Sequence, residues 1–528
     1  MKKADSPVMA GLVVLTVYAQ VFSLFYKVGL AANLLLLIFC AVAVAAFFRP
    51  LKAELCRQFK KLKAGTAIFY LFLFLLFAYG TSRGILHYDT GLYHAQSIRW
   101  IEEYGVVKGL GNLHCRLAYN SSSFCLSALF GFSFLGGQSF HCMAGFMALL
   151  LAKVCSEIAG AWKRKKLLLS DFARIMAVYY LLMIFDEMIS PASDYFMVLT
   201  VFYIVIRWLD LTERKETSWL PYALLCLAGV HVMGIKLSAA LILILVIKPA
   251  VMLIREKNLR GIVSFLLLGT GIIAPYLIRN VLISGWLVYP FTFPDIFPVD
   301  WKIPKETAVY DAREIQVWGR GIYDAARYHD PVWVWFPSWF AGQGTIDKLF
   351  VLLGIFSACA MLLVTAVILI KRKKEWYGFL NVAAAVDCSF LLWLFSAPLM
   401  RYGCVYVYLA PVITLGAFFL YAVKNRTVWR MIYLCLALAA CYKLLAFGKE
   451  VYKAYDGNYF VYQKDYENFE TKIWEQNGYT FYYAAEGDRV GYEAFPSAPQ
   501  RARIIFRGTD IKDGFDAGQG RKSAGSGK

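Results

Sequence analysis

Four of the six histidines in this 528-residue chain fall between residues 87 and 141, in a polar stretch set between long apolar segments. The stretch begins Arg83-Gly-Ile-Leu-His87-Tyr-Asp89-Thr-Gly-Leu-Tyr93-His94. Histidines and carboxylates are the groups that most often move protons in catalysis, whereas a membrane-spanning segment gains nothing from titratable groups. We therefore expect chemistry on a lipid-borne molecule at a membrane surface.

Asp89 stands between an apolar segment and a predicted helix, where a carboxylate often caps the helix by accepting backbone N–H bonds. A cap needs no histidine neighbours, and Asp89 has His87, Tyr93 and His94 close by. We therefore interpret Asp89 as a general base for an acceptor hydroxyl, assisted by His94 or Glu102. His87, Asp89 and His94 are also candidate ligands of a divalent cation, although their spacing matches no strong metal motif.

Three cationic residues, Lys236, Arg279 and Arg401, stand at predicted helix ends on the side opposite to most of the positive charge. One explanation is snorkelling, in which a long side chain reaches the interface from the end of a span. The other is a phosphate clamp, because guanidinium groups bind phosphate oxygens bidentately and lysine adds a point charge. Three such exceptions favour the clamp, as a site for the phosphate of a donor.

The remaining candidates are polar residues of the same predicted surface. For Asp194, which precedes an apolar segment, a helix cap and a functional role remain open. The candidate substrate-binding residues are His87, Tyr93, Arg116, Asn120 and Asp194.

The composition predicts the elements that must position these groups. The chain is 59% hydrophobic and 17% charged, which is too apolar for soluble domains of this length. A hydrocarbon layer about 30 Å thick needs roughly 20 apolar residues per helical crossing. We therefore predict an all-α polytopic integral membrane protein with about thirteen transmembrane helices. Their ranges are 8–26, 28–48, 67–84, 139–162, 172–189, 195–209, 219–233, 236–254, 262–283, 346–370, 376–395, 405–423 and 431–446.

The net charge of +19 is concentrated in short loops between these segments, which orients a membrane protein by keeping cations in the cytoplasm. This charge therefore indicates no nucleic-acid partner. It predicts a multi-pass protein of the cell (inner or plasma) membrane with a cytoplasmic N-terminus and an extracytoplasmic C-terminus. The outer segments are then 87–138, 284–345 and the tail, provided that 121–137 is a short outer or re-entrant helix.

The transmembrane domain is expected to cover 1–446 and the tail 447–516. Within the first outer segment, 92–104 predicts a short amphipathic helix in the interface plane, with His94 and Glu102 on its polar side. In the tail, the β-like runs 479–484 and 502–507 predict a small hairpin. The Gly/Ser-rich end, 517–528, is expected to be disordered.

The chain resembles the GT-C superfamily of membrane glycosyltransferases, which includes protein O-mannosyltransferases and aminoarabinose transferases. It is more closely similar to a bacterial family of uncharacterised GT-C-like polytopic proteins. The segments that carry the resemblance are 87–94 with 109–122, Ser190-Pro-Ala-Ser-Asp194, 275–290, 396–403 and 491–515. The resemblance implies a catalytic Asp in the first large outer loop, which Asp89 matches, a polyprenyl-phosphate-linked sugar as donor, and often a divalent metal such as Mg or Mn. More spans precede this loop than the one that the superfamily commonly has, and histidines stand in place of its usual second acidic residue.

The expected activity is transfer of a sugar from that donor to an extracytoplasmic acceptor, which would be a glycan, a lipid or a protein. Two alternatives remain at this point. One is a transporter or flippase of lipid-linked sugars, for which ionisable groups near mid-bilayer and inverted repeats are typical. The other is a polymerase of surface polysaccharide.

Overall fold

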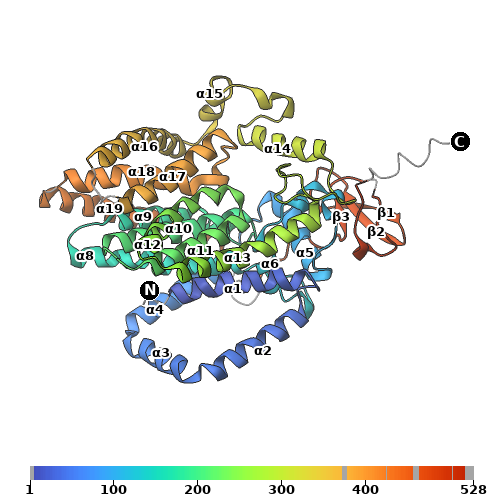
Figure 1. Ribbon diagram of the computed structural model, residues 1–528, viewed down its shortest axis with the longest axis horizontal. Coiled ribbons are helices and arrows are strands. Elements are labelled where there is room, and N and C mark those ends of the chain that lie inside the picture. The colour runs from blue at the N-terminus through green and yellow to red at the C-terminus, as the bar shows by residue number, and fades with distance from the viewer. Residues whose placement is uncertain (1–4, 372–376, 424, 456–462, 502–503, 518–528) are drawn as a thin grey trace.

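The computed structural model describes residues 5–371, 377–423, 425–455, 463–501 and 504–517 (Figure 1). The predicted disorder of 518–528 lies outside the described residues. Within them, the chain is mostly helical and ten helices are long and apolar enough to cross a membrane. They are α1 (Asp5–Ser23), α4 (Ala64–Ser82), α7 (Met143–Cys155) with α8 (Gly160–Arg164), α10 (Ser193–Glu213), η7 (Leu237–Val246) with α12 (Ile247–Arg255), α13 (Leu259–Ser284), α16 (Thr345–Ile370), α17 (Tyr377–Phe395), α18 (Met400–Ala422) and α19 (Arg426–Ala454).

Each of the thirteen predicted segments contains a helix, but three of these helices differ from a simple span. The helix α2 (Leu30–Ala46) has 17 residues and turns by 86° into α3 (Phe48–Lys61), which was expected to be a loop. The helices α9 (Leu169–Met183) and α11 (Trp219–Ile235) have 15 and 17 residues. A count of thirteen spans is therefore not confirmed.

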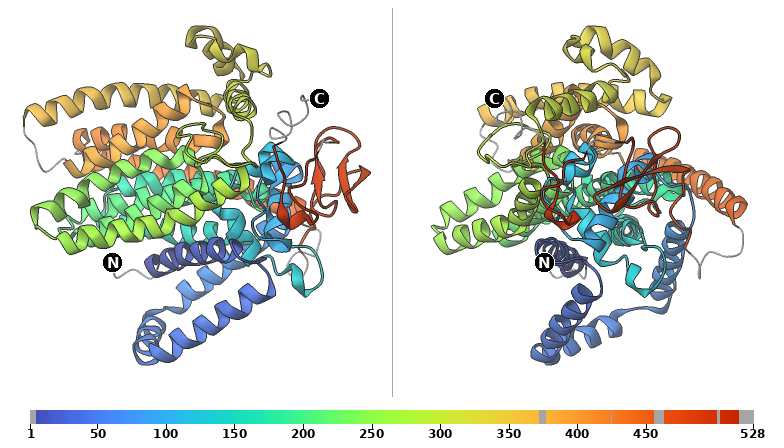
Figure 2. Two further views of the ribbon diagram at one scale, coloured as in Figure 1. Left: turned by 45° about the vertical axis from the view of Figure 1, so that its right-hand side comes forward. Right: turned by 90° about the vertical axis from the view of Figure 1, so that its right-hand side faces the viewer.

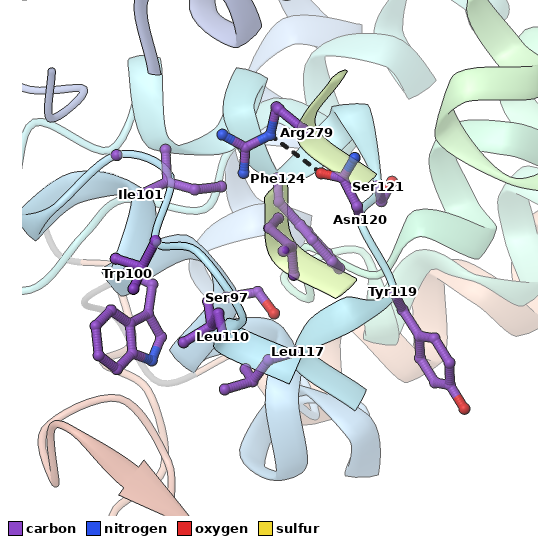
Figure 3. Close-up of a pocket in the computed structure, with 13 residues that line it drawn as sticks. Ser97, Trp100, Ile101, Leu110, Leu117, Tyr119, Asn120, Ser121, Phe124 and Arg279 are labelled. Atoms are coloured by element: carbon purple, nitrogen blue, oxygen red, sulfur yellow. Dashed lines mark hydrogen bonds between the residues drawn. The ribbon is translucent and has the colours of Figure 1, made fainter. Parts of the chain in front are cut away.

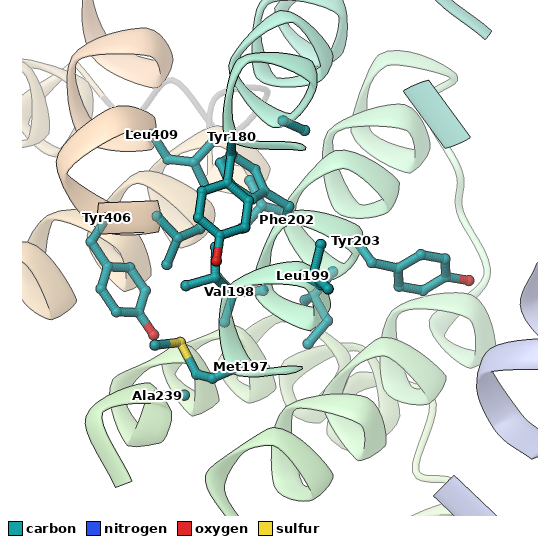
Figure 4. Close-up of a cluster of buried hydrophobic side chains, with 14 of the residues drawn as sticks. Tyr180, Met197, Val198, Leu199, Phe202, Tyr203, Ala239, Tyr406 and Leu409 are labelled. Atoms are coloured by element: carbon teal, nitrogen blue, oxygen red, sulfur yellow. The ribbon is translucent and has the colours of Figure 1, made fainter. Parts of the chain in front are cut away.

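The helix α10 forms the centre of the bundle. Every residue from Ser193 to Asp210 is buried, because α7, α9, α11, α17 and α18 all pack against it. A helix that is apolar all round is stable only when such neighbours surround it. Figure 4 shows Val198 and Phe202 of α10 in one cluster with Tyr180 of α9 and Leu409 of α18.

The three segments that were predicted to lie outside the membrane pack together at one end of the bundle, which we call the sheet end because β1–β3 lie there (Figures 1 and 2). Asn112 of the first segment donates to the backbone carbonyl of Trp301 in the second (2.9 Å). Gln96 of the first segment donates to the tail carbonyls of Gly491 (2.8 Å) and Ala494 (2.9 Å). One layer therefore joins chain segments about 400 residues apart in sequence.

The first of these segments is more deeply buried than its amphipathic pattern predicted. A π-helical turn, η1 (Thr90–His94), leads into α5 (Ala95–Glu103), and both His94 and Glu102 of the expected polar side are buried. The prediction of an exposed interfacial helix is wrong because the tail covers its polar side. The helix α6 (Ser122–Leu129) has eight residues and measures about 12 Å, which is too short for a crossing.

The tail forms a three-stranded sheet of β1 (Thr471–Gln476), β2 (Tyr479–Ala484) and β3 (Ser497–Ala498). The strand predicted at 479–484 is confirmed, and its antiparallel partner is β1. The prediction of a second strand at 502–507 is wrong for its described residues, 504–507. They contribute only an isolated bridge between Phe506 and Phe515.

Opposite the sheet end, a buried ionic network joins α9 and α10. Arg174 contacts Asp210 (2.6 Å) and Asp171 (3.1 Å), and Arg207 contacts Asp210 (2.8 Å) and Glu157 (2.9 Å). No signal in the sequence singled out these residues. Removing one partner of a buried pair leaves the other charge uncompensated, which costs more than the pair itself contributes.

We therefore expect Arg174→Ala to lower the free energy of unfolding by about 3–5 kcal/mol, because Asp171 and Asp210 lose a buried cation. Thermal unfolding of the detergent-purified protein measures this loss. The control is Arg57→Ala, which removes an exposed pair with Glu54 and is expected to cost less than about 1 kcal/mol. Equal effects of both substitutions would contradict a stabilising role for the buried network.

Candidate functional site

Asp89 lies at the sheet end, directly after a short linker that follows α4. The linker is fixed by two hydrogen bonds, from the Ile85 amide to the Asp186 carbonyl (2.8 Å) and from the His87 amide to Ser190 Oγ (2.6 Å). The Asp89 side chain makes no capping hydrogen bond to η1, so the helix-cap interpretation is wrong for this residue. Its carboxylate instead forms an ion pair with Arg401, at 2.7 Å.

Arg401 comes from the first turn of α18, more than 300 residues further along the chain. Its guanidinium donates to Nε2 of His87 (2.5 Å) as well as contacting Asp89. The side chains of Asp89 and Arg401 are 14% and 27% exposed, so the ion pair is accessible to a ligand.

A second ion pair lies beside the first. Asp194, in the first turn of α10, accepts a hydrogen bond from Lys236, which follows α11. Lys236 also lies over the ring of Tyr402, at 3.9 Å, and Arg401 lies 5.1 Å from the same ring. Both cations thus contact the same Tyr402 ring. We call these seven residues the Asp89 cluster: His87, Asp89, His94, Asp194, Lys236, Arg401 and Tyr402.

The electrostatics of the cluster favour an ionised Asp89. Burial alone would raise the pKa of Asp89, but the positive charge of Arg401 and its hydrogen bond to the carboxylate oppose this effect, and the pKa lies below its ordinary value. Burial, reinforced by Arg401, lowers the pKa of His87. In this state Asp89 is therefore a weak base, and it becomes a stronger one only when Arg401 moves away.

His94 lies behind Asp89 and does not fit the predicted role of an assisting base. Its ring packs against Tyr93 (4.4 Å) and Phe124 (5.4 Å), and Nδ1 lies 3.2 Å from the hydroxyl of Thr90. Burial lowers the pKa of His94 to about 3, so the ring is neutral at physiological pH. We therefore reassign His94 from catalysis, and Tyr93 from substrate contact, to packing that supports Asp89.

Two of the three candidate metal ligands contact the positively charged side chain of Arg401. Among the described residues, no group of three His, Cys, Asp or Glu side chains is placed to hold a metal ion. Asp89 and His87 both contact the guanidinium of Arg401, and His94 faces Thr90. The donor set of His87, Asp89 and His94 therefore does not fit a divalent metal, and we derive no step through one.

Arg279 does not join the Asp89 cluster, contrary to the predicted three-residue clamp. Its Nε donates to Oδ1 of Asn120 (3.1 Å), and Nη1 donates to Ser23 Oγ (2.5 Å). Figure 3 shows this contact with Asn120 at the edge of a cavity of about 10 Å³, enough for about one water molecule. Arg279 and Asn120 are thus buried structural partners that join α13 to the first segment.

Arg116 belongs to a separate polar cluster that the sequence did not reveal. It pairs with Glu314 (3.5 Å) of α14 (Lys305–Gly319) and stacks on Trp318 (4.6 Å). Nearby, the buried Asp311 accepts hydrogen bonds from Tyr119 and Tyr289. Burial raises the pKa of Asp311 despite these bonds. A carboxylate on an ordinary amphipathic helix carries no sequence signal that would have identified this contact.

Glu102 contacts other residues than Asp89 does. Its carboxylate accepts hydrogen bonds from Ser139 Oγ and from the hydroxyl of Tyr492 in the tail, each 2.6 Å long. Burial raises the pKa of Glu102 to about 7, although these two hydrogen bonds oppose the shift. Its predicted catalytic role is therefore replaced by a role in docking the tail.

Comparisons with known proteins give one match. A family model described as "Domain of unknown function (DUF8201)" matches residues 2–408. This range contains the whole Asp89 cluster and ends before the tail. No curated protein and no solved structure matches the chain.

The pKa of Glu102 predicts a dependence of stability on pH. The pKa of Glu102 in the folded protein exceeds the ordinary value of 4.5. The stability contributed by the protonated carboxyl is therefore fully present below pH 4.5 and is lost as the pH rises through about 7. The Gln side chain of Glu102→Gln is neutral at every pH. The loss in the free energy of unfolding between pH 5 and 8 should therefore be smaller in this variant, by up to about 3 kcal/mol. Thermal unfolding at a series of pH values measures it. The exposed neighbour Glu103, changed to Gln, is the control, and an unchanged profile in Glu102→Gln would contradict the assignment.

Proposed function

The chain belongs to the DUF8201 family, a domain of unknown function, and we propose that it is a membrane glycosyltransferase. It transfers a sugar from a polyprenyl-phosphate donor to an extracytoplasmic glycan, lipid or protein. The protein lies in a bacterial cell membrane with the sheet end outside and its N-terminus in the cytoplasm. The apolar helices and the basic residues of the connecting loops support this placement.

The observation that carries the proposal is the Asp89 cluster itself. Two carboxylates and two cations reach it from four places in the chain: the linker after α4, α10, the end of α11 and α18. Both ion pairs are partly exposed at the end of an apolar bundle, where the head group of a lipid-linked sugar would lie. Such charges are costly at the edge of a bilayer, and a ligand is the usual reason to keep them.

The proposed reaction is a direct displacement with inversion at the anomeric carbon. The acceptor oxygen forms a bond to that carbon while the bond from the carbon to the phosphate oxygen breaks, and the lipid phosphate leaves with the electron pair. Asp89 takes the proton of the acceptor hydroxyl. Arg401 and Lys236 stabilise the negative charge that develops on the leaving phosphate.

Because Asp89 is paired with Arg401, donor binding should come before proton transfer to Asp89 in this reaction. While Arg401 contacts Asp89, the lowered pKa of that carboxylate makes it a poor base. A phosphate that binds Arg401 draws the guanidinium toward itself and weakens its effect on Asp89. Donor binding would therefore raise the pKa of Asp89 and prepare it to accept a proton.

Asp89→Asn is expected to lower sugar transfer by about 10²–10⁴-fold, because the amide cannot accept the proton. The measurement is transfer by purified protein incubated with a panel of polyprenyl-phosphate sugars. Arg401→Gln, in the same assay, is expected to raise the KM for the donor as well, because it loses the phosphate contact.

Asp295→Asn is the matched control, because this half-exposed carboxylate pairs with Lys302 away from the cluster. It should keep activity within about twofold, as expected for an exposed pair. Near-normal transfer by Asp89→Asn would remove Asp89 from the chemistry. An unchanged donor KM in Arg401→Gln would remove the phosphate clamp.

A second candidate function is transport of lipid-linked sugars, and one observation favours it. Asp387 lies in the middle of α17, is only 6% exposed, and has no hydrogen-bond partner for either carboxylate oxygen among the described residues. An unpaired carboxylate inside an apolar helix is typical of proton-coupled transporters. The signal for Asp387 in the sequence is that it is an isolated acidic residue within the predicted span 376–395.

Asp387→Asn separates the two functions. A transferase does not use Asp387, so we expect transfer within about threefold of the unsubstituted protein, as for a residue outside the reaction centre. Movement of a fluorescent lipid-linked sugar across proteoliposomes, measured in parallel, should be absent in both proteins. Movement by the unsubstituted protein that Asp387→Asn abolishes would favour the transporter instead.

A further inference from the structure

A cleft of about 710 Å³ lies between residues 320–327 and the helix α15 (Val332–Gly342). Both elements project from the bundle together with α14 (Figures 1 and 2). A volume of this size is typical of pockets that hold small organic ligands. Residues on its wall include Arg320, Tyr323, Arg327, Trp335, Ser338 and Trp339.

Arg320 on this wall is a buried cation that forms no ion pair among the described residues, although the charge of Asp330, which pairs with Arg327, acts on it. It is 9% exposed, and its only hydrogen bond in the described part of the chain runs from Nη1 to the carbonyl of Tyr328 (2.8 Å). Its Nε has no hydrogen-bond partner, and no described carboxylate lies within 4 Å of its guanidinium. Burying a charge without a partner is costly, so the site favours an anionic ligand.

The other side chains of the cleft wall favour an anionic ligand that contains a sugar ring. The guanidinium of Arg320 lies 5.1 Å from the ring of Trp335, and Tyr323 at the rim is 87% exposed. Flat aromatic faces stack on the C–H faces of sugar rings, while polar groups fix the ligand's orientation. Arg327, half exposed at the rim, offers a second cation that Asp330 now holds at 2.7 Å.

The cleft lies on one side of α15. Trp333 is 79% exposed, and at 100° per residue it lies on the side of the helix opposite to Trp335, Ser338 and Gly342 of the cleft. An exposed Trp of this kind is typical of a membrane interface. The cleft therefore lies on the side of α15 opposite to this exposed Trp.

The elements around the cleft contact the loop that leads into Arg401. The indole of Trp339, on the cleft wall, donates to the carbonyl of Pro398 (2.9 Å) in that loop. Gly319, next to Arg320, packs so closely on Ala397 that an added Cβ would lie 2.7 Å from its backbone. Two elements that border the cleft are thus packed against the loop that presents Arg401.

We propose that this cleft binds an acidic saccharide, a sugar that carries a carboxylate or phosphate, as part of the acceptor. The anion pairs with Arg320 and the sugar ring lies along Tyr323 and Trp335. The inference rests on the proposed function, since it assigns the acceptor of that reaction. It adds a substrate class that the Asp89 cluster alone does not specify.

Binding of tri-galacturonate to the full-length protein in phosphatidylcholine nanodiscs tests the assignment, with neutral maltotriose as the comparison. The unsubstituted protein should prefer the acidic trisaccharide by about tenfold or more, and Arg320→Gln should weaken its binding by a similar factor. Ser338→Phe, which fills the cleft without touching Arg320, should weaken it as well. Arg313→Gln, an exposed arginine of α14 that lies outside the cleft, is the matched control and should change affinity by less than about twofold.

Equal affinity for the two trisaccharides, or unchanged binding in Arg320→Gln, would overturn the proposal. So would competition by phosphatidylglycerol added to the nanodiscs, which would assign the cleft to a lipid head group. The binding assay needs neither donor nor transfer, so the two proposals fail separately. Asp89-dependent transfer to a neutral acceptor without acidic binding would leave only the proposed function standing.

Discussion

The ion pair between Asp89 and Arg401 is the contact on which the rest of the sheet end depends. Each residue alone would be a poorly solvated charge beside an apolar bundle, and each compensates the other. The pair also fixes the N-terminal turn of α18 against the linker after α4. Lys236 and Asp194 repeat the arrangement beside the same Tyr402 ring.

The layer above the cluster gives these charges a fixed geometry. Glu102 accepts from Tyr492 of the tail, and Arg99 donates to the carbonyl of the same tyrosine at 2.6 Å. The tail thus covers the helix that follows Asp89 and excludes water from its polar side. Burial disfavours the charged form of His94, which is therefore neutral, whereas the neighbouring guanidinium of Arg401 keeps Asp89 ionised.

The centre of the bundle connects the two charged regions. Asp194 and Asp210 stand sixteen residues apart on α10, about 24 Å at 1.5 Å per residue. One pairs with Lys236 at the sheet end, and the other with Arg174 and Arg207 at the opposite end. The apolar residues between them pack on five neighbouring helices, so α10 acts as a rigid support for the cluster. Rigid support of this kind is what a preorganised charged site requires.

The sequence by itself determined the helical segments, because apolar runs of this length have no other stable form. It also identified Asp89, Asp194, Lys236 and Arg401, since charges at the ends of such runs are costly and therefore conspicuous. Only the tertiary structure decided which of them meet. Arg279 has the same sequence signal as Arg401, yet it faces Asn120 instead of Asp89. The direction in which each helix end points depends on contacts between residues hundreds of positions apart, and no local pattern records those contacts.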